Sequence, residues 1–166
     1  SVQPIWPRGT RVLEFGANAD ELAQLISDWT RARPAMFRDV IWYRIPTETD
    51  ARNWRWPTLT AVMTGRSPTH KLEVTSEGEN PIDLAFVNRG EAEERFAGEV
   101  AIDWNDAALI SSDALPGWTL RAENNRAVFE IADGNALRLS PGERRDIGWL
   151  RYDRTTKPRL SLSTTR

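Results

Sequence analysis

The sequence predicts an α+β chain, with a short β-α-β-α element over residues 1–66 followed by an antiparallel β-sandwich over residues 67–166. Two observations support this prediction. The first half contains one helical repeat of apolar residues between short apolar runs, whereas the second half alternates apolar and polar residues in short segments. Turn-forming residues also divide the second half at intervals of about ten residues. Ser67-Pro68-Thr69 marks the expected boundary between the two parts.

The first predicted elements are a strand and a helix. Residues 11–15 are a short strand candidate, and Asn18 or Asp20 can cap a helix over about residues 20–33. Pro34 ends this helix because proline removes a backbone donor and clashes with the preceding turn. The apolar side chains of the helix share one face: Leu22, Leu25, Ile26 and Trp29.

A second strand and helix complete the first part. The unbroken apolar run within residues 39–45 suits a strand buried on both faces of a parallel sheet. A helix over residues 56–63 carries proline in its first turn, and Gly65 suits the position after its C-cap. Two strands are too few for a complete parallel sheet. We therefore interpret residues 1–66 as the last part of an α/β layer or barrel, or as an irregular cap on the second half.

The second half is predicted to be all-β. The strand candidates are residues 71–76, 82–88, 99–104, 119–122, 127–132, 136–139, 146–152 and 159–163. About 100 residues with strands of this length and spacing are typical of an immunoglobulin-like sandwich. Trp118 and Trp149 are expected in its core, and Glu91, Glu93, Glu94 and Arg95 in an exposed hairpin tip.

Composition excludes several classes of function. The net charge of −2 gives no reason to expect nucleic acid or an anionic membrane as partner. No apolar run reaches the roughly 20 residues of a membrane span. The chain has no cysteine and one histidine, so we predict no metal and no cofactor. His70 is expected in an exposed linker. Because the chain begins at Ser1 with no leader-like segment, we expect a fragment or a processed form.

The candidate site lies in residues 39–59, where aromatic and polar side chains alternate. Its residues are Trp42, Arg44, Asp50, Asn53, Trp54 and Trp56. Arginine, asparagine and aspartate supply the mixed donors and acceptors that sugar hydroxyls need, and tryptophan rings stack on sugars. The alternative is that Arg44 pairs with Asp50 to hold the loop while the tryptophans pack between layers.

Catalysis has weaker support. Glu48 and Asp50 could form the carboxylate pair of a glycosidase, but their neighbours are polar and charged, so nothing in the sequence would raise the pKa of one of them. Asp103 and Asp106 fit no standard calcium loop and are expected in a solvated turn. We assign no catalytic residues.

Two resemblances extend this interpretation. Phe86-Val87-Asn88-Arg89-Gly90 and Leu139-Ser140-Pro141-Gly142-Glu143 together resemble immunoglobulin-like or fibronectin-like modules beside bacterial cell-surface and carbohydrate-active domains. The segment WYRIP-TETD-ARNW-RWPTL resembles the closing strand and loop of an uncharacterised bacterial family with a glycoside-hydrolase-like (β/α) barrel and a small C-terminal β domain. This resemblance implies that an upstream barrel portion of the same protein is a partner. A periplasmic or extracellular location is favoured, although the compartment is left open.

Three functional hypotheses follow. The first is a non-catalytic accessory or interaction module that helps to bind glycan. The second is that Arg44, Asp50, Asn53 and Trp54 contribute to a glycoside-hydrolase-like active site completed by upstream residues. The third is a structural oligomerisation domain, because exposed strand edges can pair between chains.

Overall fold

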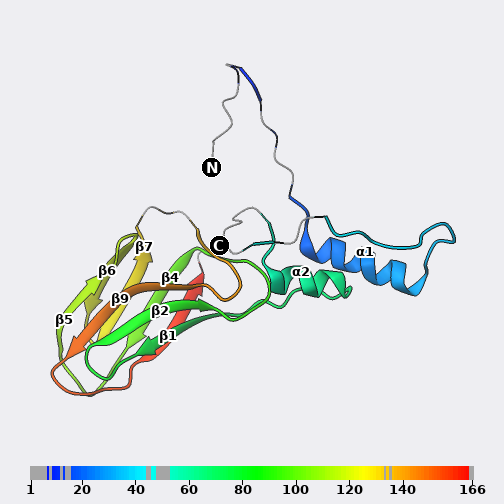
Figure 1. Ribbon diagram of the computed structural model, residues 1–166. Helices are drawn as coiled ribbons and strands as arrows, with labels where there is room; N and C mark the ends of the chain where they lie inside the picture. Colours follow the sequence, from blue (N-terminus) through cyan, green and yellow to red (C-terminus); the bar gives the residue numbers. More distant parts are fainter. Residues whose placement is uncertain are drawn as a thin grey trace.

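The computed structural model describes residues 7, 9–11, 13, 16–43, 46–47, 53–132, 134 and 136–164. These residues form mainly antiparallel β-sheets with two short helices (Figure 1). The helices are α1 (Ala19–Arg31) and α2 (Trp56–Met63). The strands are β1 (Leu72–Glu77), β2 (Ile82–Asn88), β3 (Glu94–Phe96), β4 (Gly98–Asp103), β5 (Leu109–Ala114), β6 (Trp118–Glu123), β7 (Arg126–Ile131), β8 (Leu137–Leu139), β9 (Arg144–Tyr152) and β10 (Arg159–Thr164).

Two four-stranded antiparallel sheets enclose the main core, in the orders β1-β2-β9-β5 and β10-β4-β7-β6. A short ribbon of β3 and β8 adds a third pair. This arrangement is consistent with the predicted β-sandwich. The side chains at its centre come from both sheets and include Phe86, Val100, Ile102, Phe129, Leu150 and Tyr152. Alternation explains their burial, because Val100 and Ile102 point inward while the intervening residues of β4 face outward.

Aromatic contacts fill the widest part of the core. The ring of Phe86 stacks on Trp118 with 5.5 Å between centroids and meets Phe96 at 4.7 Å. Trp104 packs edge-on against Tyr152 at 5.1 Å. Buried aromatic side chains of this size supply much of the apolar area removed from water in a small domain. The prediction that Trp118 lies in the core is confirmed, whereas Trp149 is only half-buried.

Two strands were not predicted. Strand β5 has the sequence LISSDA, whose two central serines hide the apolar alternation, and a register shift near Ser111 disturbs its pairing with β9. Strand β3 falls in the expected hairpin tip, where charged residues dominate. It forms because it pairs with β8, which is distant in sequence. A local sequence pattern cannot predict pairing between strands that are distant in the sequence.

The two helices agree with the sequence prediction. The side chain of Asn18 caps α1 by accepting hydrogen bonds from the backbone N–H groups of Asp20 (2.9 Å) and Glu21 (3.1 Å). Helix α2 has its predicted bounds, and Gly65 follows its C-cap with φ of 70°. A β-carbon at Gly65 would lie 3.0 Å from the backbone nitrogen of Ser27, so glycine also lets the two helices approach closely.

The predicted buried strand over residues 39–45 is wrong for its described part. Residues 39–43 are not in a strand, and Ile41 and Tyr43 are 90% and 95% exposed. Residues 11 and 13 are also outside any strand, and the rest of that candidate lies outside the described residues. No described residue before residue 72 belongs to a strand, so an α/β layer or barrel is not shown. Among the described residues, the apolar run has no neighbouring strand to pair with. The chain returns beside α1 instead, with the ring centroids of Phe37 and Trp29 4.6 Å apart (Figure 1).

A buried amide joins the two motifs that the sequence places 51 residues apart. Asn88 is fully buried, and its Nδ2 donates to the carbonyls of Ala92 (2.8 Å) and Leu139 (3.0 Å). Its Oδ1 accepts from the N–H of Gly90 at 2.8 Å. The Asn88 backbone also bonds to Gly142 and Glu143. Every polar atom of this side chain is therefore used, which is the condition for burying an amide.

We expect Asn88→Ala to lower the free energy of unfolding by about 2–4 kcal/mol, because it leaves several buried backbone groups without a partner. Chemical denaturation of the variant and the parent measures this difference. The matched control is Asn105→Ala at an exposed turn, for which we expect a change below about 0.5 kcal/mol. Equal losses in the two variants would contradict a special role for Asn88.

Tyr152 gives a prediction at alkaline pH. Its hydroxyl is buried without a hydrogen-bond partner among the described residues, and burial raises its pKa from 10.0 to about 12. The folded state therefore holds this proton more tightly than the unfolded state, so its contribution is complete below pH 10 and is lost as the pH rises toward 12. We expect Tyr152→Phe to equal or exceed the parent in stability at pH 7, and to lack the parent's extra loss above pH 10 in thermal denaturation.

Candidate functional site

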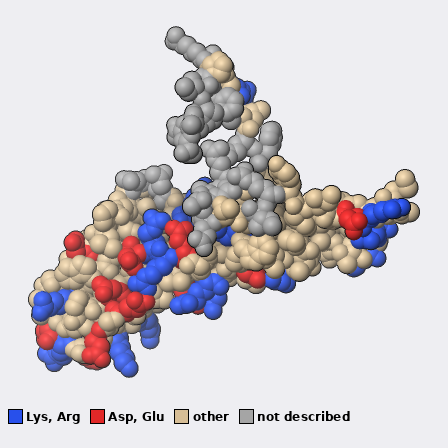
Figure 2. Space-filling model, viewed as in Figure 1, with Lys and Arg blue, Asp and Glu red and all other residues tan. Residues whose placement is uncertain are grey.

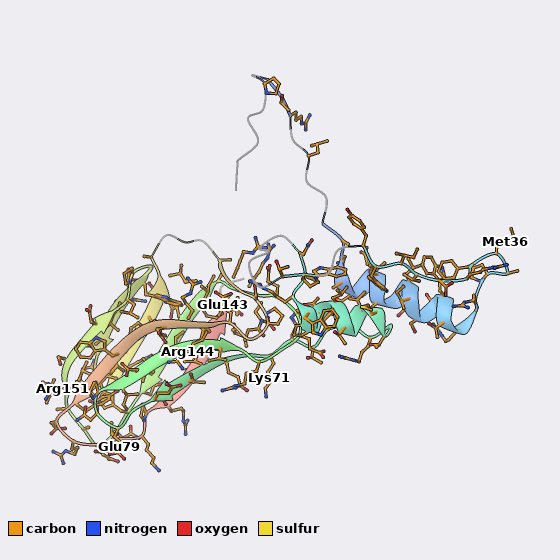
Figure 3. All side chains as sticks on the ribbon, in the orientation of Figure 1. Met36, Lys71, Glu79, Glu143, Arg144 and Arg151 are labelled. Atoms are coloured by element: carbon orange, nitrogen blue, oxygen red, sulfur yellow. The ribbon has the colours of Figure 1, made fainter. Side chains whose placement is uncertain are left out.

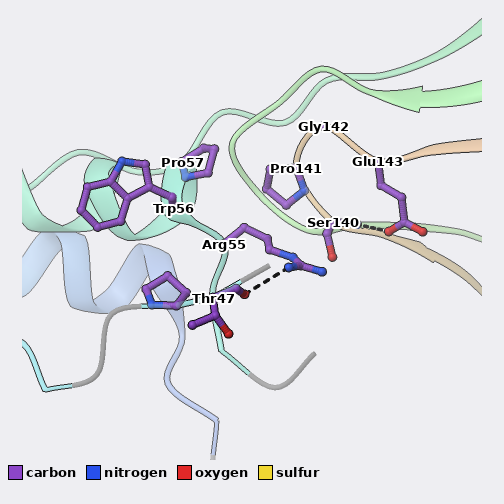
Figure 4. Close-up of a pocket in the computed structure, with 9 residues that line it drawn as sticks. Thr47, Arg55, Trp56, Pro57, Ser140, Pro141, Gly142 and Glu143 are labelled. Atoms are coloured by element: carbon purple, nitrogen blue, oxygen red, sulfur yellow. Dashed lines mark hydrogen bonds between the residues drawn. The ribbon is translucent and has the colours of Figure 1, made fainter. Parts of the chain in front are cut away.

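Two adjoining clefts lie between the helical part and the sandwich. The larger has a volume of about 700 Å³ and the smaller about 380 Å³. Both are lined by Arg55, Ser140 and Pro141, so these three residues separate one cleft from the other. Figure 4 shows the smaller cleft, where Trp56 and Pro57 of α2 stand beside the turn of Pro141 and Gly142.

The larger cleft is built from three parts of the chain. One wall is the start of α1 with Asn18, and a second is the segment before α2 with Asn53 and Trp54. The third wall is the sandwich, which contributes residues from the β3–β8 ribbon and its flanks: His70, Glu93, Arg95, Arg138 and Ser140. The walls meet because the hydrogen bonds of Asn88, together with the contacts that the helices make, hold the β3–β8 ribbon beside α2.

Charged groups on the sandwich wall are ordered by ion pairs. Arg138 donates from Nε to Oε1 of Glu93 at 3.1 Å, and from Nη2 to Oε1 and Oε2 at 2.8 and 3.1 Å. Arg95 lies 3.6 Å from the same carboxylate. His70 is exposed as predicted, with Nδ1 3.2 Å from Oε1 of Glu94. The wall therefore presents fixed donors and acceptors side by side.

Glu91 anchors the helices to this wall. Arg66 donates to its two carboxylate oxygens at 2.5 and 2.7 Å, and Thr69 donates from its backbone N and its hydroxyl at 3.1 Å each. Thr58 of α2 bonds the carbonyl of Glu91. The hydrogen bonds from Arg66, followed by that from the Thr69 backbone, lower the pKa of Glu91 to about 2. The prediction that Glu91 lies in an exposed tip is wrong. The residues next to Glu91 in the sequence do not reveal that Arg66 is its partner.

The structure brings together three of the six predicted site residues. Asn53 and Trp54 line the larger cleft, and Trp56, which is 55% exposed, lines the smaller one. Trp42 is half-buried and lines neither cleft. Arg44 and Asp50 lie outside the described residues, and so does their proposed ion pair.

Sequence reasoning missed the sandwich wall. Glu93, Arg95 and Arg138 were not linked to the tryptophan-rich segment, because what brings them there is the pairing of β3 with β8, in which Arg95 lies opposite Arg138. The resulting cleft combines an indole with amide, hydroxyl, guanidinium and carboxylate groups. It can bind a polar ligand that also has an apolar face. Within the described part of the chain, no group of three or more histidine, cysteine or acidic side chains could hold a metal ion.

The fold and cleft define a β-rich domain with a helical attachment, and one comparison finds a similarity over part of the chain. Residues 72–153 match the family model described as a domain of unknown function (DUF8456). The match begins with β1 and ends just after β9. No curated protein and no solved structure matches the chain. Neither α1 nor α2 has the length and apolar character needed to cross a membrane.

The pKa of Glu91 gives a test of the helix attachment. Glu91→Gln removes the charge that binds Arg66, so we expect it to destabilise the fold by up to about 1 kcal/mol at pH 7, because solvent screens this partly exposed pair. Because the folded-state pKa is lowered, the contribution is present above pH 4.5 and disappears as the pH falls toward 2. Thermal unfolding between pH 2 and 7 measures this convergence. Glu79→Gln, at an exposed turn, is the control. A difference in stability between the parent and Glu91→Gln that persists unchanged at pH 2 would contradict the ion pair.

Proposed function

We propose that the protein is a non-catalytic accessory module that binds a glycan in the larger cleft. The observation that carries this proposal is that Trp54 and Asn53 line the same cleft as the Arg138–Glu93 pair. An indole stacks on the apolar face of a sugar ring, and fixed guanidinium and carboxylate groups bond the hydroxyls at its edge. A volume of about 700 Å³ lies within the usual range for small-molecule sites.

A binding role fits the cleft better than catalysis. Both carboxylate oxygens of Glu93 accept hydrogen bonds from Arg138, which suits a group that recognises a ligand. The alternative of a glycoside-hydrolase-like site depends on Arg44 and Asp50 together with Trp54. No interaction of the described residues favours that alternative, so it remains the second hypothesis.

The wider setting of the module is also a proposal. The resemblance to bacterial barrel proteins supports a position beside an upstream barrel portion, which the module would stabilise or help to place on its substrate. We classify the sandwich as immunoglobulin-like on its size and its two packed antiparallel sheets. In its strand order, the last strand, β10, pairs with β4.

Trp54→Ala tests the site. We titrate the folded protein with a panel of soluble oligosaccharides and follow both tryptophan fluorescence and heat of binding. We expect saturable binding by the parent and a loss of affinity of about fivefold or more in the variant, since stacking on one aromatic ring contributes about 1 kcal/mol or more.

Two further variants make the test specific. Trp56→Ala removes an exposed indole of the adjoining cleft, so its affinity should stay within about twofold of the parent. Arg138→Gln breaks the ion pair on the opposite wall and should weaken binding as Trp54→Ala does. Absence of binding to every sugar, or equal losses for Trp54→Ala and Trp56→Ala, would overturn the proposal.

A further inference from the structure

An apolar arm extends from the helical part of the molecule. We define the arm as residues 32–43, the segment that follows α1. Its side chains of Met36, Ile41 and Tyr43 are 95%, 90% and 95% exposed. Isolated exposed apolar residues are common, but several on one short segment usually mark a contact surface. The arm is also rich in the residue types of interfaces, namely arginine, methionine and aromatics, and it has no lysine, glutamate or serine.

The arm carries two arginines, Arg33 and Arg38, and one acidic residue, Asp39, so its net charge is +1. Arg33 lies 6.0 Å from the ring centroid of Phe37, and neither Arg33 nor Arg38 is in an ion pair with another described residue. Arg31, at the adjacent end of α1, pairs with Asp28. Figure 2 shows basic side chains at this end of the molecule, beside uncharged surface. A partner for the arm therefore needs acidic groups around an apolar centre.

The sandwich has such a surface at its other end. Strand register places Glu77, Asp83, Trp149 and Asp113 in one row across all four strands of the β1-β2-β9-β5 sheet. We call this set the acidic row. It lies on the outer face, because Gly148 and Leu150 beside Trp149 are buried toward the core.

The charges of the acidic row are largely available. Within the described residues, neither Asp83 nor Asp113 is in an ion pair, whereas Glu77 pairs with Arg144. Arg151 stands on the same face one row away and offsets part of the negative charge. The half-buried indole of Trp149 between two free carboxylates is a site for a cationic or sulfur-containing side chain.

The arm and the acidic row of one chain lie at opposite ends of the molecule. Figure 3 labels Met36 at one end and Arg151, two residues after Trp149, at the other. The sandwich and α1 lie between them, so an arm cannot cover the acidic row of its own chain. The two halves of the chain also differ in charge: residues 1–66 have nine basic and seven acidic side chains, and residues 67–166 have thirteen and seventeen.

We infer that the arm of one copy docks on the acidic row of a second copy of this chain. Arg33 and Arg38 would face Asp83 and Asp113, and Met36 would pack on the indole of Trp149. Both surfaces have an apolar centre flanked by charged groups, and the charges of the two surfaces are opposite in sign. The contact is separate from the glycan cleft, so it stands or falls independently of the proposed function.

Charge reversal tests this inference. One variant carries Arg33→Glu with Arg38→Glu, and a second carries Asp83→Lys with Asp113→Lys. We measure the mass of each by light scattering after size exclusion at several concentrations. The parent should associate, with an affinity that falls as salt rises, and each variant alone should be monomeric because its arm and its acidic row then have the same sign. An equimolar mixture should recover association, because both contacts are again between opposite charges.

Two controls separate this contact from others. Met36→Ser with Ile41→Ser changes only exposed side chains and should weaken association about tenfold or more with unchanged unfolding. Glu123→Lys lies on the other sheet and should leave the mass unchanged. A parent that stays monomeric at high concentration, or variants that associate like the parent, would overturn the inference. A monomeric parent that sediments with anionic lipid vesicles would also overturn it and assign the arm to a lipid surface.

Discussion

The structure depends on the buried amide of Asn88. The amide bonds to Gly90, Ala92 and Leu139, and the backbone carbonyl of Asn88 accepts from Gly142, so this residue connects the turn after β2 with the turn before β9. Neither turn has enough apolar area to be held by packing alone. An amide with all its donors and acceptors used at zero exposure fixes both turns in one geometry, since any other arrangement would leave buried polar atoms unbonded. Gly90 is required here, because a β-carbon would lie 2.5 Å from the Thr69 carbonyl oxygen.

The position of the cleft follows from this junction. Once the turn after β2 is fixed, Glu91 faces Arg66 and Thr69, and its carbonyl accepts from Thr58 of α2. These bonds attach the helices to the sandwich through polar contacts on one short segment. The attachment leaves open space on either side of Arg55, and that space is the pair of adjoining clefts. Residues from both halves therefore line the larger cleft.

The sequence predicted elements whose cause is local. Helix α1 with its Asn18 cap, helix α2 with Gly65 after it, and most strands of the sandwich were correctly placed, because capping and alternation are written in neighbouring residues. The failures have a shared physical cause. Strand β3, the role of Glu91 and the sandwich wall of the cleft depend on partners distant in sequence. Residues 39–43 have the composition of a buried strand but no strand to pair with, so composition alone gave the wrong environment.

The two parts of the chain differ in how much of their apolar surface they bury. The sandwich encloses its own aromatic core between two sheets. The arm instead keeps Met36, Ile41 and Tyr43 in water, where burial of each side chain would gain about 1.5–3 kcal/mol. Several exposed apolar side chains on one short segment are typical of a contact surface. The apolar run is therefore better understood as one side of an intermolecular contact than as an incomplete core.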